Sequence, residues 1–263
     1  MFSSITTKTL YEKRWFLLGW TLGILTMAGV TIALYPSIKD QVGQLLASVP
    51  KQLQSVTGSA EDYRSIAGYI GSGVFDLRIP LLTLTMAIIL GINISSGEES
   101  SGQLDQLLAQ PISRTRIVLE KWLAFTIIVV FAHTALFLGV AALVPLIGES
   151  VSLSMLASTT LMGALLALVS GSLALMVSFF AGKKGLAIGI SSLLVFGSYL
   201  LTSFATQLDW LHSADNFSLF HYYKASAVMQ HGLVLNHALT MVGIILVCVI
   251  IACVGFRNRD VQA

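Results

Sequence analysis

Residues 95–121 read SSGEESSGQLDQLLAQPISRTRIVLEK and form the longest polar interval that carries both helix signals and a basic cluster. The sequence on either side is as apolar as hydrocarbon, so this interval must lie in water or at a lipid surface between two membrane spans. Leu104, Leu107 and Leu108 fall at positions i, i+3 and i+4, which places them on one face of a helix. We therefore predict a short amphipathic helix between two spans.

The ends of this short helix are also marked in the sequence. Glu98 and Glu99 precede it, where the helix dipole favours negative charge, and Pro111 stops it because proline cannot continue the backbone hydrogen bonds. Ser113 is placed to cap the next helix.

The composition excludes a soluble domain. Hydrophobic residues make up 55% of the 263 residues and charged residues only 11%, against about 25% charged in typical soluble domains. The two cysteines, Cys248 and Cys253, lie in an apolar run, where we expect them to pack as small hydrophobic side chains. We predict an all-α polytopic membrane protein whose single transmembrane domain covers residues 1–263.

Six apolar segments are long enough to cross a hydrocarbon core of about 30 Å. The predicted spans are 15–35, 74–94, 122–147, 155–180, 185–206 and 238–256. The remaining predicted segments are an interfacial helix over 1–14, an outer segment with short helices over 36–73, the polar loop 95–121 and an aromatic-rich outer interfacial segment over 207–237. Small residues at Gly19 and Gly23, and at Gly163 and Gly171, permit close contact with other helices.

Three polar side chains inside the predicted spans are candidates for a translocation path. Asp76 and Arg78 begin the second span at positions i and i+2, so they do not face each other, and charges near a span end also reach the headgroups by snorkelling. His133 lies near the middle of the third span, where it either lines a path or forms a structural hydrogen bond. No histidine pair has the spacing of a zinc-binding helix, and no metal site is predicted.

The lysines and arginines predict the orientation. With both termini in the cytoplasm, ten of the fifteen basic residues are inside: Lys8, Lys13, Arg14, Arg114, Arg116, Lys121, Lys183, Lys184, Arg257 and Arg259. Four are outside, namely Lys39, Lys51, Arg64 and Lys224, and Arg78 lies in a span. Because cytoplasmic loops carry the excess of basic residues, this orientation is favoured and the 95–121 loop is cytoplasmic.

A family resemblance rests on the residues of this loop. The order Glu98, Glu99, Gly102, Leu104, Leu107, Leu108, Pro111, Ser113, Arg114, Ile117, Lys121 resembles the first cytoplasmic loop of ABC-2 type transporter permeases. In that family the loop holds the coupling helix, which presses into the ATP-binding subunit. The resemblance implies a coupling role for this helix and its flanking charges, and outer re-entrant helices over 207–237. Without it, the loop reads as an ordinary cytosolic loop with one amphipathic turn resting on the bilayer.

The same resemblance implies the partners. They are a separate ABC ATP-binding subunit, a second permease protomer, identical or homologous, and the bilayer of the cell membrane; no nucleic acid is expected. The chain contains no G-x-x-x-x-G-K-[ST] run, so ATP and Mg²⁺ are expected in the partner subunit and no cofactor in this chain. The expected function is export of a drug, antibiotic, peptide or lipid-like compound.

Two other classes of function are compatible with a polytopic membrane protein. An intramembrane hydrolase is disfavoured, because an E-E-x-x-x-R metalloprotease pattern starting at Glu98 would need arginine where Gln103 stands. A channel or assembly scaffold without a motor is compatible with the residues. A permease of this kind binds a separate ATPase, whereas a channel or scaffold without a motor does not, so co-purification with an ATPase distinguishes the two.

Overall fold

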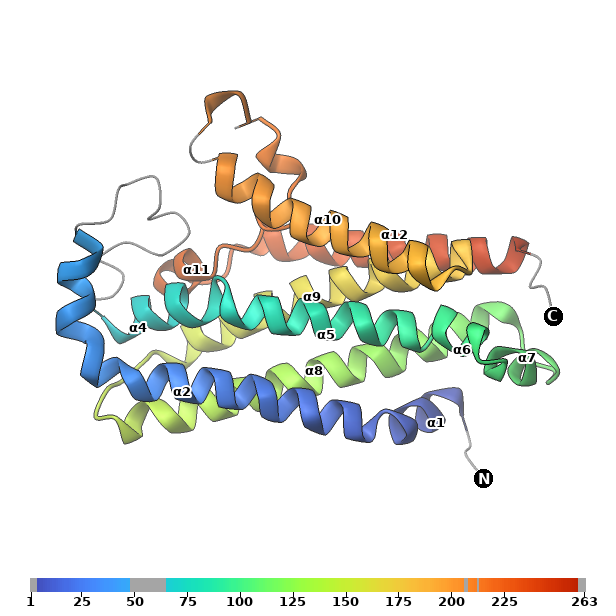
Figure 1. Cartoon of the computed structure of the whole chain (residues 1–263), viewed down its shortest axis with the longest axis horizontal. Helices are drawn as coiled ribbons and strands as arrows, with labels where there is room; N and C mark the ends of the chain where they lie inside the picture. Colours follow the sequence, from blue (N-terminus) through green and yellow to red (C-terminus); the bar gives the residue numbers. More distant parts are fainter. Residues whose placement is uncertain (1–3, 48–64, 206–207, 212, 260–263) are drawn as a thin grey trace.

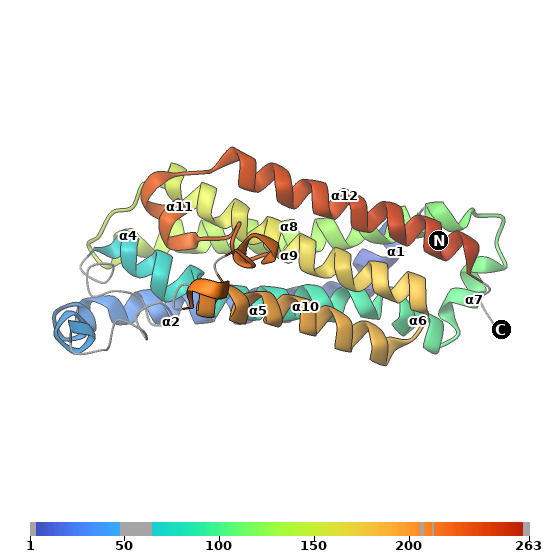
Figure 2. The same ribbon diagram turned by 90° about the horizontal axis from the view of Figure 1, so that it is seen from above.

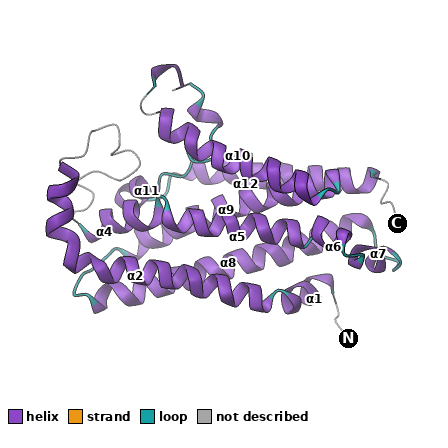
Figure 3. Cartoon of the chain, viewed as in Figure 1, coloured by secondary structure: helices purple, strands orange, loops and turns teal. Residues whose placement is uncertain are grey.

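The computed structural model describes residues 4–47, 65–205, 208–211 and 213–259, and within these ranges every regular element is a helix (Figure 3). Six helical stretches are long and apolar enough to cross a membrane. They are Arg14–Ser37, Ile66–Asn93, Arg114–Leu146, Leu153–Ala181, Lys184–Ala205 and Leu235–Asn258. The predicted all-α fold with six membrane-spanning helices is confirmed.

The long helices run side by side along the molecule (Figures 1 and 2). The elements are α1 (Ile5–Glu12), α2 (Arg14–Ala47), α4 (Ile66–Gly68), a π-helix (Tyr69–Phe75), α5 (Arg78–Asn93), α6 (Ser96–Ser100), α7 (Gln103–Leu108), α8 (Arg114–Leu146), α9 (Leu153–Ala181), α10 (Lys184–Ala205), two 3₁₀ turns (Asp209–Leu211 and Asp215–Phe217), α11 (Ala225–His231) and α12 (Leu235–Asn258). We name the two ends of the bundle by the short helices found there. The α6–α7 end also holds α1 and the last turn of α12, and the opposite end is the α4–α11 end.

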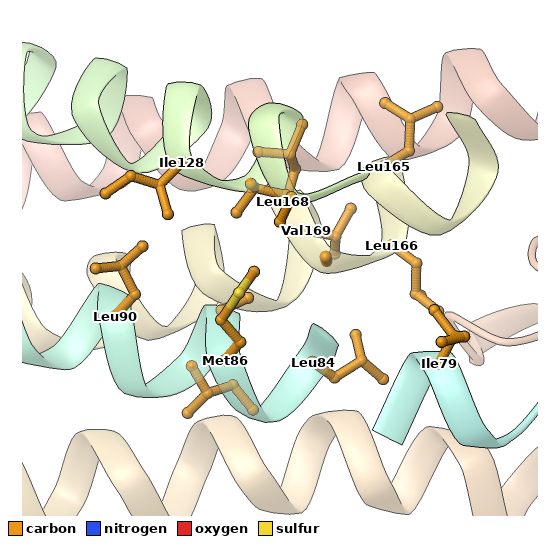
Figure 4. Close-up of a cluster of buried hydrophobic side chains, with 14 of the residues drawn as sticks. Ile79, Leu84, Met86, Leu90, Ile128, Leu165, Leu166, Leu168 and Val169 are labelled. Atoms are coloured by element: carbon orange, nitrogen blue, oxygen red, sulfur yellow. The ribbon is translucent and has the colours of Figure 1, made fainter. Parts of the chain in front are cut away.

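Helix α9 forms the centre of the bundle. It contacts α5, α8, α10, α11 and α12, and 67% of its most apolar stretch is buried, against 17% for α10. Figure 4 shows side chains of α5, α8 and α9 meeting in this core; those labelled are Ile79, Leu84, Met86, Leu90, Ile128, Leu165, Leu166, Leu168 and Val169. Glycines bring α5 and α9 together, because a Cβ on Gly91 would lie only 2.8 Å from the carbonyl oxygen of Gly171.

The second span begins earlier than the sequence predicts, at Ile66 instead of residue 74. Ser65 caps it by accepting a hydrogen bond from the backbone N–H of Gly68 at 3.1 Å. The following Ser and Gly residues resemble a loop in sequence. They are a packing surface, since a Cβ on Gly71 would lie 3.0 Å from Cα of Ser226, just inside α11.

Two other helices also extend beyond the predicted spans. α2 continues past Pro36 to Ala47, and its end bends away from the rest of the helix (Figure 1), as expected where proline interrupts the backbone hydrogen bonds. α8 begins at Arg114, within the predicted loop, where Ser113 accepts from Arg116 N–H as the expected cap. Of the outer segment with short helices predicted over 36–73, residues 48–64 lie outside the described residues. Its described parts belong to α2 and to the start of the second span.

The predicted interfacial helix at the start of the chain corresponds to α1, and it is attached to α8. The Glu120 carboxylate accepts hydrogen bonds from the backbone N–H groups of Ile5 at 2.6 Å and Thr6 at 3.2 Å. This carboxylate therefore satisfies donors in the first turn of α1, where the helix dipole also favours an anion.

Candidate functional site

The candidate site is the pair of short helices α6 and α7 together with the ends of the long helices around them. Gly102 joins α6 to α7 with a left-handed backbone, at φ 74°, which glycine adopts without steric cost. α7 ends before Pro111, and α8 begins at its Ser113 cap. A short helix thus lies between the second and third spans, as the sequence predicts.

The leucine face of α7 points into the chain itself. Leu104 is 0% exposed and Leu107 is 6% exposed, both in the hydrophobic core, and Leu108 is half-buried. The exposed residues around this turn are Gln103, Asp105, Gln106, Ala109, Gln110 and Pro111. Burying the leucines within the bundle removes their apolar surface from water, which leaves a polar face outward. The coupling role that the family resemblance implies for them stays a prediction.

A buried ion pair joins α6 to α8. Lys121 is fully buried and donates to the Glu98 carboxylate and, at 2.7 Å, to the carbonyl oxygen of Ile94 at the end of α5. Ion pairs removed from water need good geometry and additional hydrogen bonds to offset desolvation, and Lys121 has both. The pair fixes the position of α6 relative to α8.

A second ion pair joins α6 to Arg259, the residue that follows α12. Arg259 donates to the Glu99 carboxylate, and also to the carbonyl oxygens of Phe179 at 3.0 Å and Ser178 at 3.3 Å near the end of α9. Gly182, left-handed at φ 65°, makes room for it, since a Cβ there would lie 2.6 Å from the Arg259 guanidinium. The ends of α6, α9 and α12 therefore meet on one guanidinium group.

The start of α8 is attached to the same cluster. Arg114 donates to the carbonyl oxygen of Phe256 at 3.1 Å and to that of Arg259. On the α9 side, the hydroxyl groups of Ser96 and Ser178 lie 3.2 Å apart. We call this set of contacts, made by Ser96, Glu98, Glu99, Arg114, Lys121, Ser178 and Arg259, the helix-end cluster.

Sequence reasoning singled out Glu98, Glu99 and Arg114 but assigned them to an external partner. Their observed partners lie within the chain, and Lys121, Gly182 and Arg259 had not been recognised as belonging to one site. The sequence contained one usable signal: a lysine next to an apolar span has to find an acceptor if it is buried. Nothing local indicates which of the nearby carboxylates that acceptor is.

The three candidate path residues are not brought into one site. His133 is 3% exposed between α8 and α9, with Nδ1 2.9 Å from the carbonyl oxygen of Val129 and no partner for Nε2 among the described residues. Asp76 accepts from Ser226 N–H at 3.1 Å, and the exposed Arg78 donates to the carbonyl oxygen of Gly73. Asp76 and Arg78 lie near the α4–α11 end, away from the helix-end cluster.

A long groove runs between α5 and α10. Its half nearer the α6–α7 end encloses about 310 Å³ and is lined by Thr85, Ile88, Ile89, Ile92, Asn93, Lys184, Ile188, Ser192 and Phe196. Its other half encloses about 250 Å³ and is lined by Leu77, Pro80, Leu81, Leu84, Phe196, Tyr199, Leu200 and Phe220. Phe196 is common to both. We call it the α5–α10 groove; polar side chains line only its α6–α7 half, apart from the hydroxyl group of Tyr199.

A polar cluster that sequence reasoning missed lies beyond α10. Asp215 accepts from the Thr202 hydroxyl at 2.7 Å and lies 2.6 Å from His221 Nδ1, which ties the segment after α10 back to that helix. Burial would raise the pKa of Asp215, but the hydrogen bonds from His221 and Thr202 outweigh it and hold the pKa below its usual value. Within the described ranges, no His, Cys, Asp or Glu side chains form a group of three or more that could hold a metal ion.

Comparison with known proteins adds two findings. A family model described as "ABC-2 family transporter protein" matches residues 4–261. A Bacillus subtilis (strain 168) protein, described as "Uncharacterized protein YhcI", is 24% identical over 250 residues, covering 86% of this chain and 78% of that protein.

Proposed function

Because the chain belongs to the ABC-2 family of transporter membrane proteins, we propose that it is the permease subunit of an ABC exporter. In this proposal two permease protomers, identical or homologous, assemble with two ATP-binding subunits that hold ATP and Mg²⁺. The observation that carries the proposal is the helix-end cluster. It connects α6, the short helix that precedes α7, to the ends of α8, α9 and α12, as a transmission element requires.

We propose that the α6–α7 end lies in the cytoplasm. α1, the starts of α2, α8 and α10 and the ends of α9 and α12 lie at this end (Figure 1). Ten of the fifteen basic residues lie in these segments or directly beside them: Lys8, Lys13, Arg14, Arg114, Arg116, Lys121, Lys183, Lys184, Arg257 and Arg259. Cytoplasmic segments of membrane proteins are enriched in lysine and arginine. ATP and its binding subunit would be available on this side of the cell membrane.

In the proposed coupling mechanism, the ATP-binding subunit contacts the exposed polar face of α7 around Asp105, Gln106 and Gln110. The buried Leu104 and Leu107 anchor α7 to the bundle. A partner that pushes on the polar face of α7 would therefore move the bundle and not detach α7 from it. Glu98 and Glu99 then pass the movement to α8 and α12. ATP can shift the permease between packings only if its subunit binds them with different affinity.

We propose the α5–α10 groove as the path of the cargo. The lining of the groove changes from mixed polar and apolar residues at the α6–α7 end to almost wholly apolar residues at the other, which suits an amphiphilic cargo. Arg78 lies one residue from Leu77 at its outer part and, with Asp76, remains a candidate for contact with the emerging cargo. His133 is buried between α8 and α9, and its role in a path stays a prediction.

The test is co-purification with a candidate ATP-binding subunit. Replacing both Asp105 and Gln106 with Arg is expected to reduce the bound ATP-binding subunit at least about tenfold, because the new charges lie on the proposed contact face. Ser154→Arg, an exposed change at the opposite end, is the matched control. Unchanged binding by the double variant would exclude the contact face, and transport without any ATPase would identify a channel instead.

A further inference from the structure

The described part of the chain has another groove, on α2. It encloses about 380 Å³ and is lined by Trp15, Phe16, Gly19, Trp20, Gly23 and Leu82. Apart from the adjoining residues and backbone of α2 itself, no described atom lies within 4 Å of the position that a Cβ on Gly19 or Gly23 would take. The two glycines therefore leave an open channel along the helix surface, which we call the α2 groove.

The length of the α2 groove corresponds to one leaflet. Gly23 lies nine residues beyond Arg14 on a continuous helix. At about 1.5 Å per residue this is about 13.5 Å, close to half of a hydrocarbon core of about 30 Å. The groove thus extends from the headgroup level to the middle of the bilayer, the depth that one acyl chain occupies.

Two cations, Lys13 and Arg14, directly precede Trp15, the first lining residue of the α2 groove. Arg14 donates to the carbonyl oxygen of Tyr11 at 2.7 Å, and its guanidinium lies 3.8 Å above the Tyr11 ring. Among the described residues, neither Arg14 nor its neighbour Lys13 forms an ion pair with a carboxylate. Guanidinium carries five N–H donors, so donors remain for an anionic group. Trp15, 72% exposed beside them, has the amphipathic ring typical of the membrane interface.

We propose that the α2 groove is a binding site for one anionic phospholipid. Its phosphate lies against Lys13 and Arg14, and one acyl chain follows Gly19 and Gly23 towards Leu82. The lipid belongs to the leaflet at the α6–α7 end, which is the cytoplasmic leaflet under the proposed orientation. The site itself depends on neither that orientation nor an ATP-binding partner.

Charge favours a lipid over a second copy of this chain as the occupant. A symmetric contact between two copies places the same surface patch on both sides. Two α2 helices crossing at Gly19 and Gly23 would therefore bring Lys13 and Arg14 towards the same cations of the other copy. An anionic headgroup is attracted to those cations instead.

The test uses purified protein in nanodiscs of phosphatidylcholine with 10% phosphatidylglycerol, and counts retained lipids by native mass spectrometry after the bilayer is removed. The wild-type protein is expected to retain phosphatidylglycerol at least about tenfold above its share of the mixture, as two interfacial cations predict. Replacing Lys13 and Arg14 together with Gln should reduce this preference to near the bulk ratio. Replacing Gly19 and Gly23 together with Leu fills the groove and should have the same effect.

Gly243→Leu is the matched control for filling the groove. Gly243 also has nothing within 4 Å of its missing Cβ and is exposed, but it lies on α12, away from Lys13 and Arg14. This variant should retain phosphatidylglycerol like the wild type. Size-exclusion chromatography and melting temperature in detergent show whether each variant folds. Unchanged lipid retention in the folded groove variants would overturn the proposal, and a dimer lost on glycine replacement would assign the groove to a second copy.

Discussion

At the scale of single residues, the buried pair of Glu98 and Lys121 dominates the α6–α7 end. Glu98→Gln should destabilise the protein by about 3–5 kcal/mol, because it leaves the fully buried Lys121 ammonium without its counter-charge. Melting in detergent measures the loss. The double replacement Glu98→Leu with Lys121→Met removes both charges and should recover much of it. If the single variant melts like the wild type, the pair does not hold α6 in place.

Asp215 gives a second residue-scale prediction, on pH. Its pKa is held below the usual value in the folded protein, chiefly because hydrogen bonds from His221 and Thr202 outweigh the effect of burial. A group with a depressed folded pKa stabilises the protein above its unfolded pKa of about 3.9, and this stability is lost as pH falls through the folded value. Melting temperature should therefore fall less steeply between about pH 5 and 3 in Asp215→Asn than in the wild type. Parallel curves would contradict this assignment.

At the scale of elements, two left-handed glycines provide a matched comparison. Gly102→Ala should cost about 1–2 kcal/mol from backbone strain alone, since its missing Cβ faces open space. Gly182→Ala adds a methyl group 2.6 Å from the Arg259 guanidinium and should cost clearly more, because Arg259 must leave Glu99 and Phe179 to avoid it. Melting temperatures test the order. Equal losses would show that Arg259 moves aside without losing stability.

Several elements could be predicted because their signals are local. Apolar length indicated the six spans, the leucine spacing predicted α7, and Ser113 predicted the start of α8. The direction of the leucine face could not be predicted, since a face buried in the same chain and a face docked on a partner have the same period. The early start of the second span was missed because a glycine such as Gly71 is expected both in a loop and at a close contact between helices.

The contacts of the helix-end cluster were beyond sequence reasoning for a different reason. Glu98 and Lys121 are 23 residues apart, and Glu99 and Arg259 are 160 apart. Only the packing of α9 against α5, α8 and α12 brings these side chains together. Composition and periodicity give no information on contacts between residues so far apart in the sequence. Each charge was therefore first assigned to solvent or to an external partner.

At the scale of the whole molecule, the contacts divide the bundle into unequal parts. The helix-end cluster ties α6, α8, α9 and α12 together. Only 17% of the most apolar stretch of α10 is buried, and α10 faces α5 across a groove. Packed cores change between discrete arrangements instead of deforming smoothly, so the weakly packed helix is the one expected to move. We predict that the tied helices move as one body and that α10 moves against them during transport.

Paired cysteines test this division, in a variant whose Cys248 and Cys253 are replaced by Ala. Ser96→Cys with Ser178→Cys forms a disulfide inside the tied body, where the two hydroxyls already lie 3.2 Å apart, and should leave ATPase turnover of the complex within about twofold. Ile89→Cys with Ile188→Cys, bridged by a bifunctional thiol reagent across the α5–α10 groove, should reduce turnover at least about tenfold, because closure or opening of the groove is blocked. Reducing the bridge should restore it. The opposite result, with the Ser96–Ser178 disulfide inhibitory and the groove bridge silent, would place the moving boundary within the helix-end cluster.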